Sequence, residues 1–168
     1  MPFTPEQLSD IEAIRDVGRL YAHSLDRLDA EGMRRAYWPD ASDDHGLEFR
    51  GRAWDYVDVA MESHLRWRPS LHTLLNHMVA LDPGGRTARG EIYVVAYLFE
   101  VARPVLHTWM GRYLDRYEKR DDEWRIIERV VVHEGSRFDD PLVRMPFDQS
   151  DFRQGSFDRP SSLRPIGP

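Results

Sequence analysis

The sequence of 168 residues predicts a single α+β domain, in which three N-terminal helices pack on one face of a curved, mainly antiparallel sheet. Two observations predict this fold class. Apolar residues recur at spacings of three and four near the N-terminus, which is typical of an amphipathic helix. The second half of the chain consists instead of long β-rich runs separated by turn residues, which is typical of strands connected as hairpins.

Three helices are expected in the first part of the chain. Residues 4–7 (Thr-Pro-Glu-Gln) combine an N-cap hydroxyl, a first-turn proline and a glutamine three residues after the cap, so the first helix begins there. Asp29 can cap a second, short helix that ends before Pro39. Residues 40–46 are expected to form a loop, and residues 51–67 a third helix. The apolar stripe of the first helix consists of Leu8, Ile11, Ile14, Val17 and Tyr21.

Four long strands are expected after the helices. The first covers residues 72–81 and is closed by Asp-Pro-Gly-Gly at residues 82–85, a strong turn signal. Residues 87–101, 105–117 and 124–133 are rich in β-branched and aromatic side chains, and they form the next three strands. Their order and short connections predict an antiparallel meander.

Periodicity ends at Ser136, which divides the chain into a domain of residues 1–135 and an extended, proline-rich tail of residues 136–168. The tail holds five of the eleven prolines. Two interpretations of it remain open: it is disordered, or it wraps a neighbouring subunit. The second interpretation rests on apolar residues that could anchor it, namely Leu142, Val143, Met145, Phe147, Phe152, Phe157 and Leu163.

The composition limits the chemistry that the chain can perform. The absence of cysteine excludes disulfides, a thiol nucleophile and iron–sulfur centres. The one lysine, Lys119, lies in a charged, turn-like stretch where nothing would desolvate it for Schiff-base chemistry. If the protein is an enzyme, it works with His, Asp, Glu, Tyr and Arg side chains.

The charge pattern limits the partners. The net charge is −6, and the arginines are interleaved with carboxylates, so we expect no nucleic-acid partner. No apolar run approaches the roughly 20 residues of a membrane-spanning helix, so we expect no membrane partner. The N-terminus lacks the basic and apolar regions of a signal peptide, which favours a cytoplasmic location.

Strand parity selects the polar residues that share one face of the first strand. His72 and Asn76 are on the same face as Leu74, Met78 and Ala80, whereas His77 is on the other. The two histidines therefore cannot ligate one metal ion, and we predict no metal site. A carboxylate beside His72 would fix its tautomer and make it a base, and Asp26, after the first helix, is the candidate. The alternative is a purely structural histidine.

Several segments together resemble the SnoaL-like proteins of the nuclear transport factor 2-like superfamily. The resemblance covers residues 8–134 and rests on the joint order and spacing of its pieces. It implies a cone-shaped α+β barrel. The pieces are residues 21–29 (Tyr-Ala-His-Ser-Leu-Asp-Arg-Leu-Asp), 37–41 (Tyr-Trp-Pro-Asp-Ala), His72 with Asn76, 111–116 (Gly-Arg-Tyr-Leu-Asp-Arg), 123–126 (Glu-Trp-Arg-Ile) and Arg129.

Within the superfamily, the chain looks similar to cofactor-free lyases such as scytalone dehydratase and hexachlorocyclohexane dehydrochlorinase. The resemblance implies that His72 is a general base oriented by Asp26, that Arg129 stabilises developing negative charge, and that no cofactor is needed. His45 falls where scytalone dehydratase has a substrate-facing tyrosine, and this substitution leaves its role open. Residues 95–99 lack the second catalytic histidine of that enzyme, so the dehydrochlorinase is the better template.

The expected function is therefore that of a lyase, a dehydratase or dehydrohalogenase, acting on a small, largely apolar molecule. Expected substrate-binding residues are Tyr21, Trp38, His45, Trp54 and Asn76. A non-catalytic ligand-binding or interaction domain, and an isomerase similar to polyketide cyclases or ketosteroid isomerase, remain alternatives. The hydrophobic outer face of the sheet predicts a homo-oligomer. Because the lyase relatives are trimers, we favour a homotrimer over a dimer.

Overall fold

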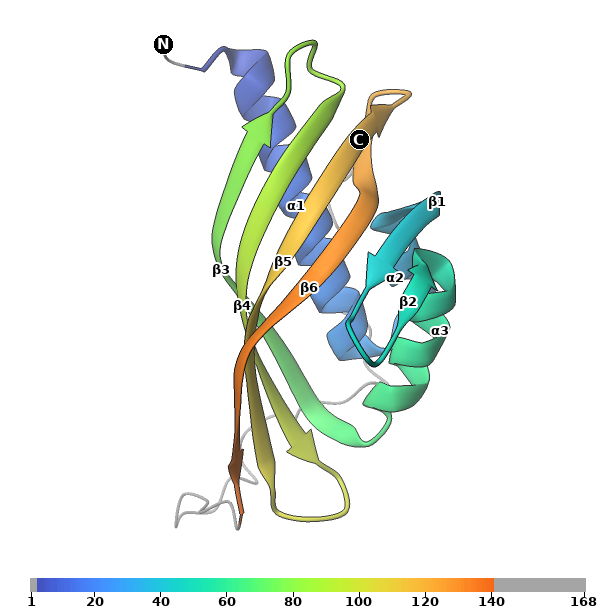
Figure 1. Cartoon of the computed structure of the whole chain (residues 1–168), viewed down its shortest axis with the longest axis vertical. Coiled ribbons are helices and arrows are strands. Elements are labelled where there is room, and N and C mark those ends of the chain that lie inside the picture. The colour runs from blue at the N-terminus through green and yellow to red at the C-terminus, as the bar shows by residue number, and fades with distance from the viewer. Residues whose placement is uncertain (1–2, 141–168) are drawn as a thin grey trace, which may run out of the picture.

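The computed structural model describes residues 3–140, which form three helices and six strands (Figure 1). The helices are α1 (Pro5–Arg27), α2 (Ala30–Arg35) and α3 (Ala53–His64). The strands are β1 (Tyr37–Asp44), β2 (Arg50–Arg52), β3 (Trp67–Leu81), β4 (Thr87–Glu100), β5 (Leu106–Arg120) and β6 (Glu123–Asp139). None of the helices in the described part of the chain is long and apolar enough to span a membrane.

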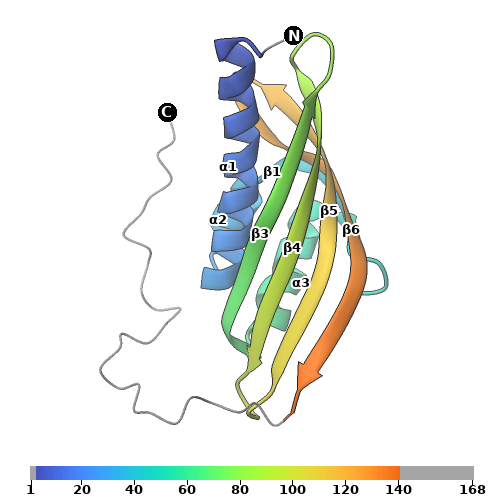
Figure 2. The same cartoon turned by 90° about the vertical axis from the view of Figure 1, so that its left-hand side faces the viewer.

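All six strands form one twisted sheet in the order β2-β1-β6-β5-β4-β3. The β1–β6 pair is parallel and the other pairs are antiparallel. The sheet does not close, because β2 and β3 are both edge strands. Helix α1 lies across its inner face beside β3, and α3 contacts β1, β2 and β3, so it covers the gap between the two edges (Figures 1 and 2). The predicted α+β fold is confirmed.

The predicted starts of the first two helices are correct. The Thr4 hydroxyl accepts a hydrogen bond from the Gln7 backbone at 3.2 Å, and the Gln7 side chain accepts one from the Thr4 backbone at 2.9 Å. Asp29 accepts from the Gly32 backbone at 2.9 Å and caps α2. The stripe of α1 is buried from Ile11 to Tyr21, whereas Leu8 is exposed.

The loop expected at residues 40–46 is wrong, since β1 runs to Asp44. Its polar composition suggested a loop, but pairing with β6 on one side and β2 on the other imposes an extended backbone. Ala41 and Asp43 are buried on its inner side. The third helix is correspondingly shorter than expected, because the pairing of β2 extends to Arg52 and β3 already begins at Trp67.

Strand β6 ends at Asp139, beyond the point at which the sequence loses its periodicity. Most of the predicted tail lies outside the described residues, and both interpretations of it stay predictions. The other strand boundaries agree with expectation to within a few residues, apart from the earlier start of β3.

A β-bulge in β3 reverses which residues face inward. Leu74 pairs with Val94, but His77 pairs with Ile92, so β3 contains one extra residue there. Leu74 and His77 consequently both lie over Gly18 of α1. The expected sharing of a face by His72 and Asn76 is therefore wrong, as is the expected opposition of His72 and His77; Asn76 is exposed.

A second bulge, in β6, determines the orientation of Arg129. Tyr117 pairs with Ile126, whereas Arg116 pairs with Glu128, so Ile127 is the extra residue. Ile126 and Arg129 are both fully buried, although an unbroken strand would place them on opposite faces. The bulge therefore brings an arginine into the interior between the sheet and α1.

Candidate functional site

Asp26 and His72 meet between the end of α1 and the inner face of β3. His72 Nδ1 lies 2.7 Å from Asp26 Oδ1, and the His72 backbone N–H donates to Oδ2 at 2.9 Å. The Ser70 hydroxyl donates to Oδ1 at 3.0 Å. The His72 and Asp26 side chains are only 7% and 12% exposed. Three donors on β3 thus hold one carboxylate in a fixed position.

The local structure explains why this pair forms. Asp26 is in the last turn of α1, which ends where Leu28 adopts a left-handed conformation. Alternation along β3 turns Ser70 and His72 to the same side, before the bulge. Because β3 is an edge strand, backbone N–H groups that point away from β4 have no strand partner, and the N–H of His72 donates to Asp26 instead.

This arrangement suits proton transfer. A carboxylate at Nδ1 fixes the tautomer and the orientation of an imidazole and stabilises the imidazolium that forms when the ring takes up a proton. In the pair described here, Nε2 is the nitrogen left to meet a substrate. The structure brings together these two residues that the sequence singled out, and it adds Ser70, which the sequence did not indicate.

His64 of α3 is a neighbour of the pair that the sequence did not single out. Its ring centroid lies 5.6 Å from that of His72, and its Nδ1 lies 2.9 Å from the Ala60 carbonyl oxygen. Burial, with a smaller contribution from His72, lowers the pKa of His64 to about 4, so this ring is neutral at pH 7. The spacing of four between Tyr56, Ala60 and His64 is the signal that places it on the inner face of α3.

Arg129 is fully buried and already paired. Its Nε and Nη2 donate to the two oxygens of Asp115, each at 2.7 Å. The guanidinium lies 4.1 Å from the ring centroids of both Tyr21 and Tyr113. The Tyr117 hydroxyl also donates to Asp115, at 2.7 Å. The charge of Arg129 is therefore compensated within the protein.

Two buried donors beside this ion pair form no hydrogen bond of good geometry within the described residues, although the Tyr21 hydroxyl interacts with Tyr56 and Arg129. They are the Nη1 of Arg129 and the hydroxyl of Tyr21. Burial raises the pKa of Tyr21 to about 12, so its hydroxyl keeps its proton. An unsatisfied buried donor is costly, and a site for an anionic or carbonyl oxygen would satisfy both groups.

Trp38, Trp54 and His45, which were also predicted to bind substrate, are not among the hydrogen-bond partners of His72 and Asp26 described above. The indole nitrogen of Trp38 donates to the Glu118 carbonyl at 3.0 Å, and the indole ring packs against Arg120 and Arg125. The indole nitrogen of Trp54 is buried without a partner in the part of the chain that the structure describes. His45 contacts Asp43 and stacks on Tyr56.

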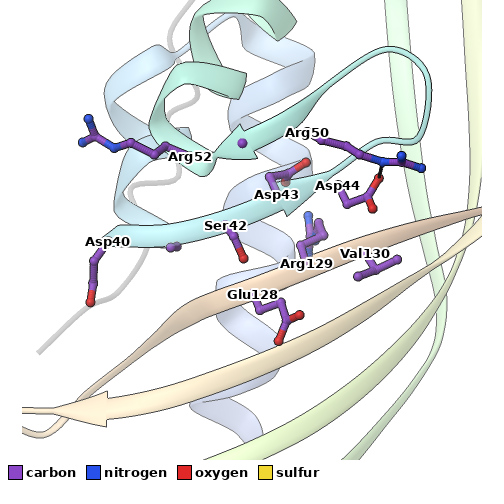
Figure 3. Close-up of a pocket in the computed structure, with 11 residues that line it drawn as sticks. Asp40, Ser42, Asp43, Asp44, Arg50, Arg52, Glu128, Arg129 and Val130 are labelled. Carbon is purple, nitrogen blue, oxygen red and sulfur yellow. Dashed lines mark hydrogen bonds and ion pairs between the residues drawn. The ribbon is translucent and has the colours of Figure 1, made fainter.

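Two surface cavities of about 520 Å³ each lie elsewhere, and neither is lined by His72 or Asp26. One lies where β1 and β2 meet β6, and Figure 3 shows side chains of both charges around it. In this cavity, Arg50 donates to Asp44 at 2.9 Å. The other lies on the outer face of β3 to β6. Within residues 3–140, no three His, Asp or Glu side chains gather as metal ligands.

The buried imidazole of His77 makes the stability of the fold depend on pH. Burial lowers its pKa to about 4, as it does that of His64, and an unfolded histidine has a pKa near 6.5. Between these values the unfolded chain binds more protons than the folded chain, so stability should fall as the pH drops from about 6.5 to 4.

The His77→Phe variant should lose part of this dependence. We expect its urea midpoint to fall less steeply than that of the parent over this pH range, whereas His23→Gln, at an exposed position on α1, should leave the slope unchanged. Equal slopes for the parent and His77→Phe would show that this ring titrates normally in the folded state.

Comparison with known proteins agrees with the fold. Residues 6–130 match the SnoaL-like domain family, and the chain belongs to this family, within the nuclear transport factor 2-like superfamily. No curated protein matches the chain. The resemblance read from the sequence is confirmed.

Solved structures share the fold at low sequence identity. A candidate scytalone dehydratase of Novosphingobium aromaticivorans superposes with a TM-score of 0.71 at 18% identity, over 77% of this chain and 87% of the other. The type 3 hexachlorocyclohexane dehydrochlorinase of Novosphingobium barchaimii gives 0.69 at 19% identity, over 83% and 96%. A protein of unknown function from Mycobacterium tuberculosis gives 0.67 at 23% identity, over 78% and 76%. At these identities the likeness concerns the fold.

Proposed function

We propose that this SnoaL-like protein is a cofactor-independent lyase in which His72 removes a proton from carbon and Asp26 orients it. The observation that carries the proposal is the 2.7 Å contact between His72 Nδ1 and Asp26 Oδ1. The Ser70 hydroxyl and the His72 backbone N–H also donate to this carboxylate and hold it in place. Names of structurally similar proteins, a dehydrochlorinase and a candidate dehydratase, support an elimination reaction.

The reaction would proceed by general-base catalysis. His72 Nε2 takes the proton, the C–H electron pair becomes a new double bond, and the leaving group departs with its own electron pair. Asp26 stabilises the imidazolium, and the buried donors of Tyr21 and Arg129 stabilise negative charge on the substrate. A positioned base contributes about 10²–10⁴-fold to the rate, and preorganised donors supply more.

A small panel of substrates tests the proposal. We would incubate the full chain with γ-hexachlorocyclohexane and with two β-substituted ketones, 4-chloro- and 4-hydroxy-4-phenylbutan-2-one, which both give the same conjugated enone. We expect the elimination product to form faster than in buffer, with turnover lost in His72→Gln. Binding of these compounds without any turnover would instead favour the ligand-binding alternative.

We propose that the outer face of the sheet is covered by another copy of the chain, in a homotrimer. Apolar side chains on β3, β4 and β5 are 38–67% exposed and lie on adjacent strands, as expected for a face that another copy covers. They are Leu71, Leu75, Met78, Tyr93, Tyr97 and Met110. Light scattering at micromolar concentration should give about 59 kDa, three times 19.7 kDa, and less for Tyr97→Glu. A parent mass of one subunit would contradict this.

A further inference from the structure

The chain contains a second His–Asp pair, between β1 and the turn that follows it. His45 Nδ1 contacts Asp43 Oδ1, and the Tyr37 hydroxyl donates to Asp43 Oδ2 at 2.6 Å. The His45 side chain is 11% exposed, and the Asp43 side chain has no exposed surface. The pair therefore repeats the arrangement of His72 and Asp26, in which the carboxylate also faces Nδ1.

The ring of His45 is held in one orientation. It stacks on Tyr56 of α3, with ring centroids 3.8 Å apart and planes at 20°. Its backbone N–H donates to the Phe49 carbonyl at 2.8 Å, which fixes the turn after β1. The cost of removing the Asp43 carboxylate from water offsets most of what its contacts with His45 and Tyr37 contribute, so the pair adds little to stability.

Both pairs contact the inner face of α3. His45 stacks on Tyr56, and His72 lies beside His64, about two turns further along the same helix. His64 is within electrostatic range of both His72 and His45. Because His64 is neutral at pH 7, it adds no charge beside His72. The two imidazoles therefore lie along the same face of α3.

We propose that His45, oriented by Asp43, is the general acid that protonates the leaving group, and that the substrate is accordingly a β-hydroxy carbonyl compound. This inference rests on the proposed function, because it assigns the partner of the base His72. Chloride leaves as a weak base and needs no proton, whereas hydroxide is a poor leaving group unless it is protonated. A second proton-transfer pair is therefore useful for dehydration and of little use for dehydrochlorination.

The proposed step balances without any other reactant. His72 Nε2 takes the proton from the carbon next to the carbonyl, and the C–H electron pair forms the C=C bond. The C–O bond at the β carbon breaks, and its electron pair leaves with the oxygen. His45 Nε2 gives its proton to that oxygen, so the products are an enone and water. Exchange with solvent then returns His72 and His45 to their starting states.

The two ketones with different leaving groups test this assignment. In His45→Gln, we expect turnover of 4-hydroxy-4-phenylbutan-2-one to fall about 10²–10⁴-fold, and to fall at least ten times more than turnover of the 4-chloro compound. In His72→Gln, both compounds should lose turnover to a similar extent, because both reactions begin with the same proton. His23→Gln is the matched control.

A second variant guards against a simple folding defect. Asp43→Asn keeps the ring of His45 and the Tyr37 neighbour but removes the carboxylate, so it should give the same selective loss on the hydroxy compound, with an unchanged thermal midpoint for folding. Equal losses on the two compounds in both variants, or no loss on the hydroxy compound, would overturn the role of His45 and leave that of His72 standing. Full activity of His72→Gln would instead overturn the proposed function.

Discussion

Replacing His72 by glutamine should lower the rate of elimination by about 10²–10⁴-fold on the substrate that the panel identifies. The imidazole Nε2 is the proposed proton acceptor, and a glutamine amide is not a base at neutral pH. The amide can still donate to Asp26, and the backbone bond from residue 72 to the carboxylate is retained. We therefore expect the loss in kcat while the fold is preserved.

The measurement is a comparison of kcat for the parent, His72→Gln and His23→Gln, with the thermal unfolding midpoint of each. His23 is an exposed histidine on α1 and should behave as the parent does. Turnover of His72→Gln within a factor of three of the parent would exclude this residue as the base.

Replacing Arg129 by methionine should destabilise the fold by about 3–5 kcal/mol. The substitution leaves the buried carboxylate of Asp115 with the Tyr117 hydroxyl as its remaining described hydrogen-bond partner. It also removes a cation that lies between the rings of Tyr21 and Tyr113. The cost arises mainly because an isolated buried charge is expensive, not because the ion pair is strongly favourable.

Two controls, measured by urea unfolding at pH 7, separate the cost of an unpaired buried charge from the strength of the ion pair. The double variant Arg129→Met with Asp115→Leu should regain most of the lost stability, because it leaves no unpaired charge. Arg116→Met removes the exposed partner of Glu128, which lies 3.4 Å away, and should cost less than about 1 kcal/mol. If Arg129→Met and Arg116→Met lowered the free energy of unfolding equally, this would contradict the description of Arg129 and Asp115 as a buried ion pair.

Local signals were sufficient for much of the fold. The cap at Thr4 and the stripe from Ile11 to Tyr21 predicted α1, because capping and helical periodicity are properties of neighbouring residues. The alternation in β4, where Ile92 and Val94 are buried and Tyr93 is exposed, was equally readable. The strand β1 was not, because its extended backbone is imposed by pairing with residues far away in the sequence.

The candidate site was predictable in part. Asp26 and His72 were identified through their resemblance to a family, and the structure places them in contact. Asn76 was misplaced because strand parity assumes an unbroken ladder, and the bulge before His77 inserts one residue. The complete burial of Arg129 was not predicted, because it depends on the bulge at Ile127. No local signal in the sequence announces either bulge.

The pairing of His45 with Asp43 illustrates a further limit. The two residues are two positions apart, and the loop expected there does not determine where their side chains point. Once residue 43 belongs to a strand whose inner side is buried, its carboxylate is oriented by Tyr37, and the turn brings His45 back toward it. The pair therefore became recognisable only with the three-dimensional structure.

The central claim is that His72 and Asp26 act as one proton-abstracting unit, and a double-mutant cycle measures it most directly. We would determine kcat/KM for His72→Gln, Asp26→Asn and the combined variant on the same substrate. Residues that act as a unit are strongly non-additive. We predict that the combined variant is no slower than His72→Gln alone, to within about threefold. Losses that multiply, so that the combined variant is slower by the product of the two single effects, would contradict the claim.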